Sequence, residues 1–420
     1  MPEKFIINGE NKLKGEIEAR GAKNVAFPVL VASLLTDQDC VIDNLPLIED
    51  VFKIIEIIKS MDVDVQWIGP RKVKINAKNI NPNKIKKELV SKLRGSISLF
   101  GALLARFHKA NLPQPGGCVI GSRPITTHLD AFKQLGITVT PETNSFSLKI
   151  DDPKPATVIL NEFSVSATLN VLIYASLVPG QTTIKIADQD YQTQELVKVL
   201  NKMGAKIKIH PFNTITVDGV KKLKGFNYKL IYDPIEAGTF ILLAGATKSN
   251  LIVKNVEIEL LDLVLKKLKD FGLIFKQLDK STIEVMPSHN VKIEKIQALP
   301  YPGMSTDLLP LFGVWATQTE GMTLLHDPLY EGRLKYLEEL NKMGANIIFS
   351  DPHRAIIPGP TPLYGVEINS PDLRGGASLI VGALVAKGET VINNIYQIDR
   401  GYEKIEERLQ KIGADIKRVS

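Results

Sequence analysis

The sequence predicts a two-domain α/β protein built from six βαβαββ-type units, and three observations lead to this prediction. The chain has 420 residues, more than one hydrophobic core usually organises, so two domains of roughly 200 residues each are expected. A helix-glycine-strand phrase recurs along the chain. Each recurrence follows a short stretch that is apolar on all sides, which is typical of a fully buried helix.

The recurring phrase marks the end of each unit. It is clearest in NKMGAKIKI at 201–209, NKMGANIIF at 341–349 and QKIGADIKR at 410–418, and weaker in IKSMDVDVQ, KQLGITVTP and KDFGLIFKQ. The glycine-equivalent positions are 62, 136, 204, 272, 344 and 413, which lie 68 to 74 residues apart. The chain therefore divides into six units of similar length, three for each domain.

Each unit begins with a buried helix, continues with a short strand and ends with a one-sided helix and further strands. The six buried helices are expected in GAKNVAFPVLVASLL, LRGSISLFGALLARF, SVSATLNVLIYASLV, IEAGTFILLAGAT, STDLLPLFGVWAT and LRGGASLIVGALVA. CVIDNL, TTIKIAD and TVINNI are examples of the strand. EDVFKIIEIIKSM and GYEKIEERLQKIG carry the single apolar stripe of an amphipathic helix. Units of this kind would pack their buried helices inside and their sheets outside.

The first strand region, KFIINGENKLKGEIEA, needs a partner that the C-terminal half of the chain can supply. We therefore expect one domain made of residues 1–23 and 232–420, which contains both termini. Residues 24–231 would form an inserted domain that carries the PGGC loop at 115–118.

Composition narrows the class of protein. The formal net charge is only +6 and the lysines are spread along the chain, which favours small anionic ligands over nucleic acid. Two cysteines, Cys40 and Cys118, cannot form a disulfide framework, and no Cys/His cluster has the spacing of a metal site. The start of the chain has no apolar signal core and no apolar run reaches the ~20 residues of a membrane span. A reducing cytoplasm is the expected location.

Polar and charged residues open the six expected buried helices. They are Lys23 and Asn24, Arg94, Ser164 with Ser166, Asp233 with Glu236, Asp307, and Arg374 after Asp372. Helix N-termini carry unpaired N–H groups and a partial positive charge, so their convergence on a cleft between domains would suit a phosphate or carboxylate ligand. Capping alone is the alternative for each residue. It explains Lys23, Arg94 and Arg374 less well, because a cation at a helix start opposes the dipole and needs an anion nearby.

Two further segments carry candidate residues. In PQPGGCVIGSRPITTH at 113–128, the glycines allow an unusual backbone and present Cys118 near Arg123, where the pKa of a thiol could be lowered from its usual ~8.5. His128 is the one histidine of interest there. In IDRGYEKIEERL, Arg400 precedes an amphipathic helix, where a surface ion pair is the alternative. Dinucleotide, Walker A, zinc-protease and esterase motifs are missing from the sequence.

These segments resemble a known family. GAKN at 21–24, LRGS at 93–96, LARF at 104–107, PGGCVIGSRP at 115–124, DLRGGASL at 372–379 and DRGYE at 399–403 are similar to the UDP-N-acetylglucosamine enolpyruvyl transferases, and the similarity runs from end to end. The resemblance implies a two-domain inside-out α/β barrel. It also implies transfer of the enolpyruvyl group of phosphoenolpyruvate to the sugar 3-hydroxyl by addition and elimination, the first committed step of peptidoglycan synthesis, with no metal and no organic cofactor.

The resemblance also implies roles for individual residues. Lys23, Arg123 and Arg400 would hold phosphoenolpyruvate with Arg374, and Asn24 would contact the bound substrates. Cys118 would protonate the methylene carbon and would be the thiol that fosfomycin alkylates, while Asp307 would contact the sugar hydroxyl and accept its proton, with Lys23 as a third catalytic residue. The expected residues around the UDP-sugar are Arg94, Arg123, Pro124, Ile125, Thr126, Thr127, Ser164, Val165, Asp307 and Leu329. Arg333 in YEGRL resembles another arginine of the cleft.

At the nucleotide end the sequence departs from the family pattern. Thr126 stands where the family usually has an aspartate, Glu162 where it commonly has a lysine, and Ser98 where it has a tryptophan. QDYQ at 189–192 replaces an acidic phrase. Two alternatives therefore stay open at this point: an enolpyruvyl transferase for a different acceptor, such as another nucleotide or shikimate 3-phosphate, and a non-catalytic binding protein.

Overall fold

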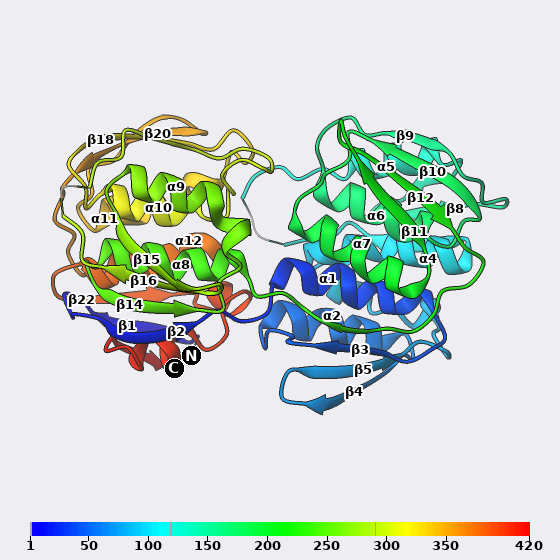
Figure 1. The fold of residues 1–420 in the computed structure, drawn as a ribbon, viewed down its shortest axis with the longest axis horizontal. Coiled ribbons are helices and arrows are strands. Elements are labelled where there is room, and N and C mark those ends of the chain that lie inside the picture. Colours follow the sequence, from blue (N-terminus) through cyan, green and yellow to red (C-terminus); the bar gives the residue numbers. More distant parts are fainter. Residues whose placement is uncertain (1, 118–119, 290) are drawn as a thin grey trace. The chain divides into compact units, whose positions relative to one another are not determined.

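The computed structural model describes residues 2–117, 120–289 and 291–420. The chain forms two compact units (Figure 1). Unit 1 contains Met1–Arg20, Cys118–Ser122 and Tyr232–Ser420, and unit 2 contains Gly21–Gly117 and Arg123–Ile231. Each unit has its own hydrophobic core. Within the described ranges, no helix combines the length and apolar character needed to cross a bilayer.

The α/β class predicted from the sequence is correct, and the sheets share one design. All five four-stranded sheets consist of one parallel pair followed by two antiparallel pairings. Their orders are β21-β22-β1-β23, β15-β16-β14-β2 and β17-β18-β20-β19 in unit 1, and β13-β3-β5-β4 and β11-β12-β10-β9 in unit 2. A three-stranded antiparallel sheet, β6-β8-β7, completes unit 2.

The strands are short and their bounds are as follows. Unit 1 has β1 (Lys4–Asn8), β2 (Lys14–Glu18), β14 (Asn250–Lys254), β15 (Ile274–Asp279), β16 (Thr282–Met286), β17 (Lys295–Gln297), β18 (Gly321–His326), β19 (Ile348–Asp351), β20 (Arg354–Gly359), β21 (Glu367–Asn369), β22 (Glu389–Asn393) and β23 (Asp415–Val419). Unit 2 has β3 (Cys40–Asp43), β4 (Asp64–Gly69), β5 (Lys72–Asn76), β6 (Lys109–Pro113), β7 (Thr138–Pro141), β8 (Ser145–Lys149), β9 (Thr157–Ile159), β10 (Gly180–Lys185), β11 (Lys206–His210), β12 (Thr214–Gly219) and β13 (Asn227–Lys229).

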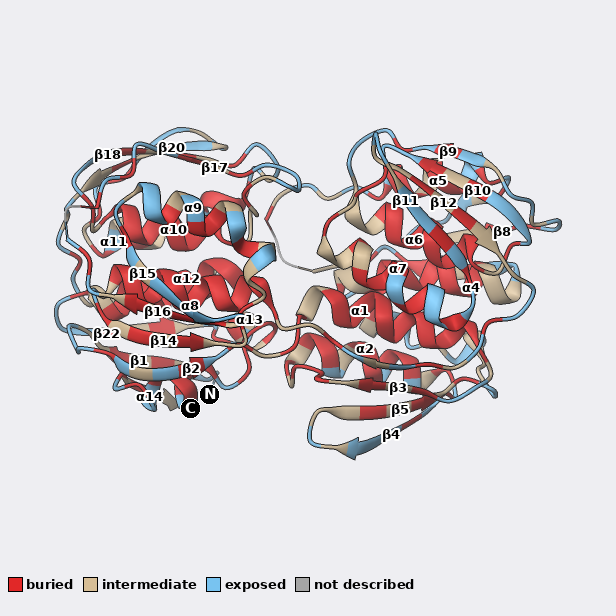
Figure 2. Ribbon diagram, in the orientation of Figure 1, coloured by how far each residue is buried: buried red, intermediate tan, exposed pale blue. Residues whose placement is uncertain are grey.

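Helices are present in all six stretches predicted to be buried. They are α1 (Lys23–Ala32), α4 (Leu99–Phe107), α6 (Val165–Ala175), α8 (Pro234–Ala246), α10 (Leu309–Ala316) and α12 (Leu373–Val385). Every residue of α8 and α10 is buried, and these helices are red along their length in Figure 2. Side chains that are apolar all round leave no face suited to water, so such helices lie inside the units.

Two starts differ from the prediction. Arg94 opens a 3₁₀ helix, η3 (Arg94–Ser98), that precedes α4. Asp307 lies before α10, which begins at Leu309.

Most of the remaining helices follow a buried helix and precede the later strands of the same repeat, whereas η2 (Pro82–Lys84) and α3 (Lys87–Val90) follow β5. The others are α2 (Glu49–Ser60), α5 (Thr126–Gln134), α7 (Tyr191–Met203), α9 (Asp262–Asp270), α11 (Tyr336–Lys342), α13 (Tyr396–Asp399) and α14 (Ile405–Gln410), with 3₁₀ turns η1 (Ser33–Leu35), η4 (Ile258–Leu261) and η5 (Arg333–Lys335). The six repeat positions 62, 136, 204, 272, 344 and 413 all have a positive φ, between 59° and 110°. This backbone favours glycine and explains why five of the six are Gly.

The N-terminal strands find the distant partners that the sequence predicted. β1 lies between β22 and β23 and is antiparallel to both, with Phe5 opposite Ile392 and Arg418. β2 runs parallel to β14. Both termini therefore belong to unit 1. The two units separate at Arg20/Gly21 and Ile231/Tyr232, against the expected 23/24 and 231/232, and residues 120–122 group with unit 1.

Candidate active site

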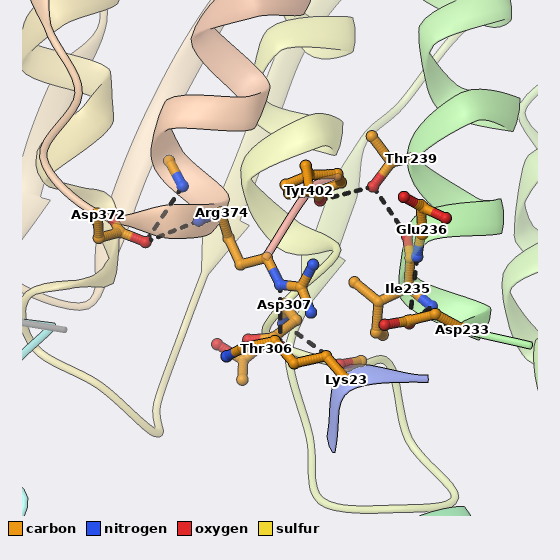
Figure 3. Close-up of polar contacts among 12 residues, drawn as sticks. Lys23, Asp233, Ile235, Glu236, Thr239, Thr306, Asp307, Asp372, Arg374 and Tyr402 are labelled. Atoms are coloured by element: carbon orange, nitrogen blue, oxygen red, sulfur yellow. Dashed lines mark hydrogen bonds and ion pairs between the residues drawn. The ribbon is translucent and has the colours of Figure 1, made fainter. Parts of the chain in front are cut away.

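A cluster of acids and arginines in unit 1 contains Asp307, the residue predicted to contact the acceptor hydroxyl. Its carboxylate accepts a hydrogen bond from Arg333 Nη2 at 2.9 Å. It accepts another from Arg374 Nε at 3.2 Å (Figure 3). The Asp307 side chain is 23% exposed, whereas both arginines are buried. Capping of α10, the alternative interpretation of Asp307, does not describe its contacts, because its carboxylate is engaged by two guanidinium groups.

Arg333 is surrounded by acceptors. Besides Asp307, its guanidinium donates to Thr306 Oγ1 at 3.1 Å and lies 3.5 Å from Asp372 Oδ1 and 4.0 Å from Asp327 Oδ2. Burial alone would lower the pKa of Arg333, but the charges of Asp307, Asp372 and Asp327 outweigh burial and raise it. Thr306 also bonds to the Asp327 carboxylate. Arg333 is thus held on several sides, which suits a residue that organises the cluster.

Arg374 differs from Arg333 because two of its guanidinium nitrogens lack a hydrogen-bond partner among the described residues. Among the described residues neither Nη atom of Arg374 has a hydrogen-bond partner, although the side chain is only 4% exposed. Its guanidinium carbon lies 5.3 Å from the centre of the Tyr402 ring, and the Tyr402 hydroxyl bonds to Thr239 at 2.9 Å (Figure 3). A buried cation with unsatisfied donors is costly, so this position is suited to an oxyanion.

The backbone N–H groups beside Arg374 already have a partner within the chain. Asp372 caps α12 and accepts from the backbone N–H groups of Arg374 at 3.1 Å and Gly375 at 3.2 Å (Figure 3). Asp233 caps α8 in the same way, through Ile235 and Glu236. For Asp372 and Asp233 the capping interpretation is therefore correct.

Arg400 lies directly after α13 and is 6% exposed. Its Nη1 donates to Gln397 Oε1 at 3.0 Å. The surface ion pair considered for Arg400 does not fit this burial. The next residues, Gly401 and Tyr402, lead the chain to the Tyr402 ring that faces Arg374. A Cβ at position 401 would lie 2.4 Å from Leu373 Cδ1, so this turn packs tightly against the start of α12.

In unit 2, Lys23 opens α1 and has the anion that its position requires. Its Nζ lies 3.1 Å from Asp50 Oδ2, and Asp50 is nearly buried in the first turn of α2. The ammonium also lies 5.6 Å from the centre of the Phe27 ring. Asn24 is the next residue of α1 and is half-buried. Asp50 was not identified from the sequence, although an acid in the first turn of the following helix is a usable signal.

The segment around the predicted UDP-sugar residues is tied together by backbone and hydroxyl contacts. Arg94 Nη2 donates to the carbonyl of Pro124 at 3.1 Å. Arg123 is half-buried, Ile125 is buried, and Thr126 is exposed at the start of α5. Ser164 caps α6 and accepts from Ala167 N at 3.3 Å, and Val165 is the first residue of that helix.

Glu162, which replaces a lysine of the family pattern, is exposed and has a hydrogen-bond partner in α5. Its carboxylate accepts a hydrogen bond from the Thr127 hydroxyl at 2.8 Å. Thr127 is the second residue of α5, so the negative charge lies at the N-terminal end of a helix, where it is favoured. Asp190 of the QDYQ phrase caps α7 through Gln192 N at 2.6 Å, which is a structural role.

His128 is part of a buried neutral network. Its Nε2 lies 2.9 Å from Ser166 Oγ, and its Nδ1 accepts from the Asn170 side-chain amide at 2.9 Å. Asn170 in turn donates to Ile97 O and accepts from Gly101 N. Burial, reinforced by Arg94, lowers the pKa of His128 to about 3. His128 therefore stays uncharged near neutral pH and links α5, α6 and α4.

Cys118 falls outside the described residues. Residues 120–122 are described and belong to unit 1. Ile120 O accepts from Gly332 N at 2.9 Å, and Ser122 N donates to the Glu331 carboxylate at 2.6 Å. Leu329 is partly exposed, and its N–H donates to Asp327 at 2.9 Å. Glu331 was not singled out from the sequence. Cys40, the other cysteine, is buried, and burial raises the pKa of its thiol to about 12.

The chain is similar to known proteins over nearly its whole length. A family model described as EPSP synthase (3-phosphoshikimate 1-carboxyvinyltransferase) matches residues 7–409. UDP-N-acetylglucosamine 1-carboxyvinyltransferase 3 from Caldanaerobacter subterraneus subsp. tengcongensis is 39% identical, and 99% of each chain is covered. The proteins named UDP-N-acetylglucosamine 1-carboxyvinyltransferase from Treponema denticola and Halothermothrix orenii are also 39% identical, with 98% and 99% of each chain covered. The chain belongs to this enolpyruvyl transferase family.

Solved enolpyruvyl transferases have the same fold. The enolpyruvyl transferase NikO from Streptomyces tendae aligns with a TM-score of 0.91 at 23% identity, with 100% of this chain and 99% of that chain covered. EPSP synthase from Acinetobacter baumannii aligns with a TM-score of 0.74 at 18% identity over the whole of both chains. The resemblance read from the motifs is thus confirmed: the chain is a transferase of the enolpyruvyl transferase family.

The sequence identified some residues of this candidate site and missed others. Helix-start residues such as Asp307 and Arg374 were identified, because polar residues at the starts of apolar helices are visible in one dimension. Asp327 and Tyr402 were missed. Asp327 follows a strand, and Tyr402 lies in the DRGYE segment without being singled out. Only the fold brings these two residues to Arg333 and Arg374.

Proposed function

We propose that this protein transfers the enolpyruvyl group of phosphoenolpyruvate to the 3-hydroxyl of UDP-N-acetylglucosamine and releases inorganic phosphate. In the addition step the hydroxyl oxygen bonds to C2 of phosphoenolpyruvate, the hydroxyl loses its proton, and C3 gains one. In the elimination step C3 loses a proton, the C2–O bond to phosphate breaks, and the enolpyruvyl ether remains. The reaction would serve as the first committed step of peptidoglycan synthesis, in the cytoplasm.

Relatives that carry the name of this activity support the acceptor. They match nearly the whole chain at 37–39% identity, and their similarity extends through both units. We likewise propose the finer architecture of the family, an inside-out α/β barrel of six repeats, with residues 1–23 and 232–420 as one domain and 24–231 as the other. The shared design of the five four-stranded sheets supports the repeats.

The single observation that carries the chemistry is the buried Arg374 guanidinium, whose two Nη atoms lack partners among the described residues. The phosphate or carboxylate of phosphoenolpyruvate would accept those N–H groups. Preorganised donors of this kind stabilise the charge that must be held as phosphate departs. Lys23, Asn24, Arg123 and Arg400 would complete the set that binds phosphoenolpyruvate.

Asp307 is suited to receive the acceptor hydroxyl. Each of its carboxylate oxygens accepts one guanidinium hydrogen bond, from Arg333 and from Arg374. A carboxylate accepts several hydrogen bonds at once and is a base, so Asp307 would contact the sugar hydroxyl and take its proton. The two arginines fix the orientation of this carboxylate.

Cys118 would deliver the proton to C3 of phosphoenolpyruvate, as the resemblance implies. The UDP-sugar would be held by Arg94, Arg123, Ser164, Val165 and the segment that begins at Pro124. Ile125, Thr126, Thr127 and Leu329 would be further contacts of the sugar nucleotide.

The experiment is phosphate release from phosphoenolpyruvate with UDP-N-acetylglucosamine, measured for the parent protein, a Cys118→Ala variant and a Cys40→Ala variant. Release that is lost with Cys118→Ala and kept with Cys40→Ala supports the proposal, because only one of the two thiols is assigned a role. Shikimate 3-phosphate serves as the competing acceptor. Turnover of that acceptor, with silence towards UDP-N-acetylglucosamine, would overturn the proposed acceptor.

A further inference from the structure

Arg418, the fourth of the five residues of β23, donates hydrogen bonds to three acidic side chains. It lies on β23 opposite Phe5, with its guanidinium carbon 5.0 Å from the centre of that ring. Its Nε donates to Glu406 Oε1 at 2.6 Å. Its Nη1 and Nη2 donate to the two carboxylate oxygens of Asp399 at 2.9 and 2.7 Å. A third acid, Glu3, accepts from Nη1 at 2.9 Å.

The two hydrogen bonds from Arg418 to the Asp399 carboxylate form a fork, and this fork is the part of the arrangement that affects the candidate site. Two parallel N–H···O bonds fix both the distance and the orientation of a carboxylate, which a single bond does not. Hydrogen bonding to Asp399 raises the pKa of Arg418, so its guanidinium stays charged. The side chains of Arg418 and Asp399 are 24% and 20% exposed, so solvent only partly screens them.

Asp399 is the last residue of α13, and Arg400 is the next residue of the chain. The turn that carries Arg400 is therefore held on two sides. On one side, Arg418 donates two hydrogen bonds to Asp399. On the other side Gly401 packs against Leu373, and Tyr402 faces Arg374. α13 is a single turn of four residues, which is too short to hold its own orientation without such contacts.

We propose that Arg418 is a positioning residue for phosphoenolpyruvate binding, which acts through Asp399 on the place and direction of Arg400. The inference rests on the proposed function, in which Arg400 holds phosphoenolpyruvate. Arg418 has no contact with substrate in this proposal. Loss of the fork would let the 399–402 turn shift, and displacement of a binding group by about 1 Å can cost far more than the strength of the lost bond.

The test compares Arg418→Gln, Asp399→Asn and the double variant with the parent protein. The KM for phosphoenolpyruvate, the KM for UDP-N-acetylglucosamine, kcat and the Tm are measured for each. We expect either single variant to raise the KM for phosphoenolpyruvate roughly tenfold and the double variant to raise it no further, because the two residues act as one unit. The KM for UDP-N-acetylglucosamine should stay within about twofold.

Glu3→Gln is the matched control. It removes only the exposed third arm of Arg418 and leaves the fork to Asp399, so it should leave the KM for phosphoenolpyruvate at the parent value. Arg418→Lys keeps the charge but cannot form the fork, and should behave like Arg418→Gln. If Arg418→Gln does not fold, Asp399→Asn decides the question, since it keeps the bond between Arg418 and Glu406.

A purely structural Arg418 would give a different result: a lower Tm for Arg418→Gln and Asp399→Asn with an unchanged KM for phosphoenolpyruvate. That result, in a parent protein that turns over, would overturn this inference and leave the proposed function intact. Calorimetric titration with phosphoenolpyruvate in the presence of UDP-N-acetylglucosamine separates the remaining cases. A parent that binds no phosphoenolpyruvate overturns both proposals, whereas binding that weakens in the variants supports the role of Arg418 even if the acceptor proves to be different.

Discussion

In both units, candidate site residues lie near the starts of buried helices. In unit 1 charged side chains gather there, whereas in unit 2 a neutral hydrogen-bond network joins the helices. In unit 1, the starts of α10 and α12 carry a dense set of charges, in which Arg333 and Arg374 share Asp307. In unit 2, the helices α4, α5 and α6 are joined by the uncharged side chains of His128 and Asn170. Charged contacts in this unit include the ion pair between Lys23 and Asp50.

The difference shows that a repeated scaffold does not dictate what its helix starts do. Where arginines are buried, carboxylates must accompany them, and a network of several charges results. Where the buried group is an imidazole with two neutral partners, lowering its pKa is enough to avoid a buried charge. The charged region is suited to an anionic substrate, and the neutral region to holding three helices in register.

Arg374→Gln should have the largest effect of any change that tests this contrast. It removes the guanidinium N–H groups proposed to bind phosphoenolpyruvate, so kcat/KM for phosphoenolpyruvate should fall by about 10²- to 10³-fold. Phosphate release measures it. Lys266→Gln, which removes a cation from an exposed ion pair of α9, is the control and should stay near the parent value. Retention of activity within tenfold of the parent by Arg374→Gln would show that the charged region is not the anion site.

Arg333→Gln should mainly affect stability. Arg333 is 3% exposed, and its loss leaves Asp372 and Asp327 buried without their shared cation. The free energy of unfolding should fall by about 3 kcal/mol or more, measured by urea denaturation. Arg354→Gln breaks an exposed pair with Asp351 and should cost at most about 1 kcal/mol. Equal losses in the two variants would contradict the distinction between a network and a surface pair.

His128 should make unit 2 sensitive to acid. Its pKa is lowered from the ordinary value to about 3 in the folded protein, so the unfolded chain binds the proton first as pH falls. The contribution of His128 to stability is complete above about pH 6.5 and declines below it, by about 2 kcal/mol at pH 5. Urea denaturation at pH 7 and pH 5 should show a smaller difference for His128→Gln than for the parent. An unchanged difference would mean that other groups control the acid sensitivity.

Glu162→Lys should have the smallest effect. It restores the charge that the family pattern has at this position, so the KM for UDP-N-acetylglucosamine should fall by about two- to fivefold at low ionic strength and return towards the parent value in high salt. Glu88→Lys makes the same charge change at another exposed position of unit 2 and should leave this KM unchanged. A rise in KM with Glu162→Lys would indicate that the bond to Thr127 is itself needed for nucleotide binding.

Much of the fold could be predicted because hydrophobic periodicity and left-handed turns are local signals. The six buried helices are where their apolar stretches predicted. Asp62, which replaces glycine in one repeat, also has a positive φ, 59° against 110° for Gly204. The pairing of β1 with the last strands followed from its need for partners. Helix starts were less predictable. Arg94 opens a 3₁₀ turn and Asp307 precedes α10, because the first residues follow side-chain contacts as much as intrinsic propensity.

The partners within the site could be predicted only in kind. The sequence indicated that Lys23 and Arg374 each need an anion, and Asp50 and Asp307 are the carboxylates that lie beside them. Their identities could not be derived, since the pairs are separated by many residues and depend on tertiary packing. Arg418 gave no signal at all. It is an isolated arginine in a polar C-terminal strand, and only the fold brings it to Asp399.

The position of β1 between β22 and β23 has a consequence for how the protein is made. β1 is synthesised long before β22 and β23, its two neighbours. The described strands of unit 2 lie between residues 40 and 229, so that unit can complete its sheets while translation continues. The sheet that contains β1 must wait for β22 and β23. While residues 9–388 are synthesised, both edges of β1 therefore remain unpaired, and this sheet can close only after β23 has left the ribosome.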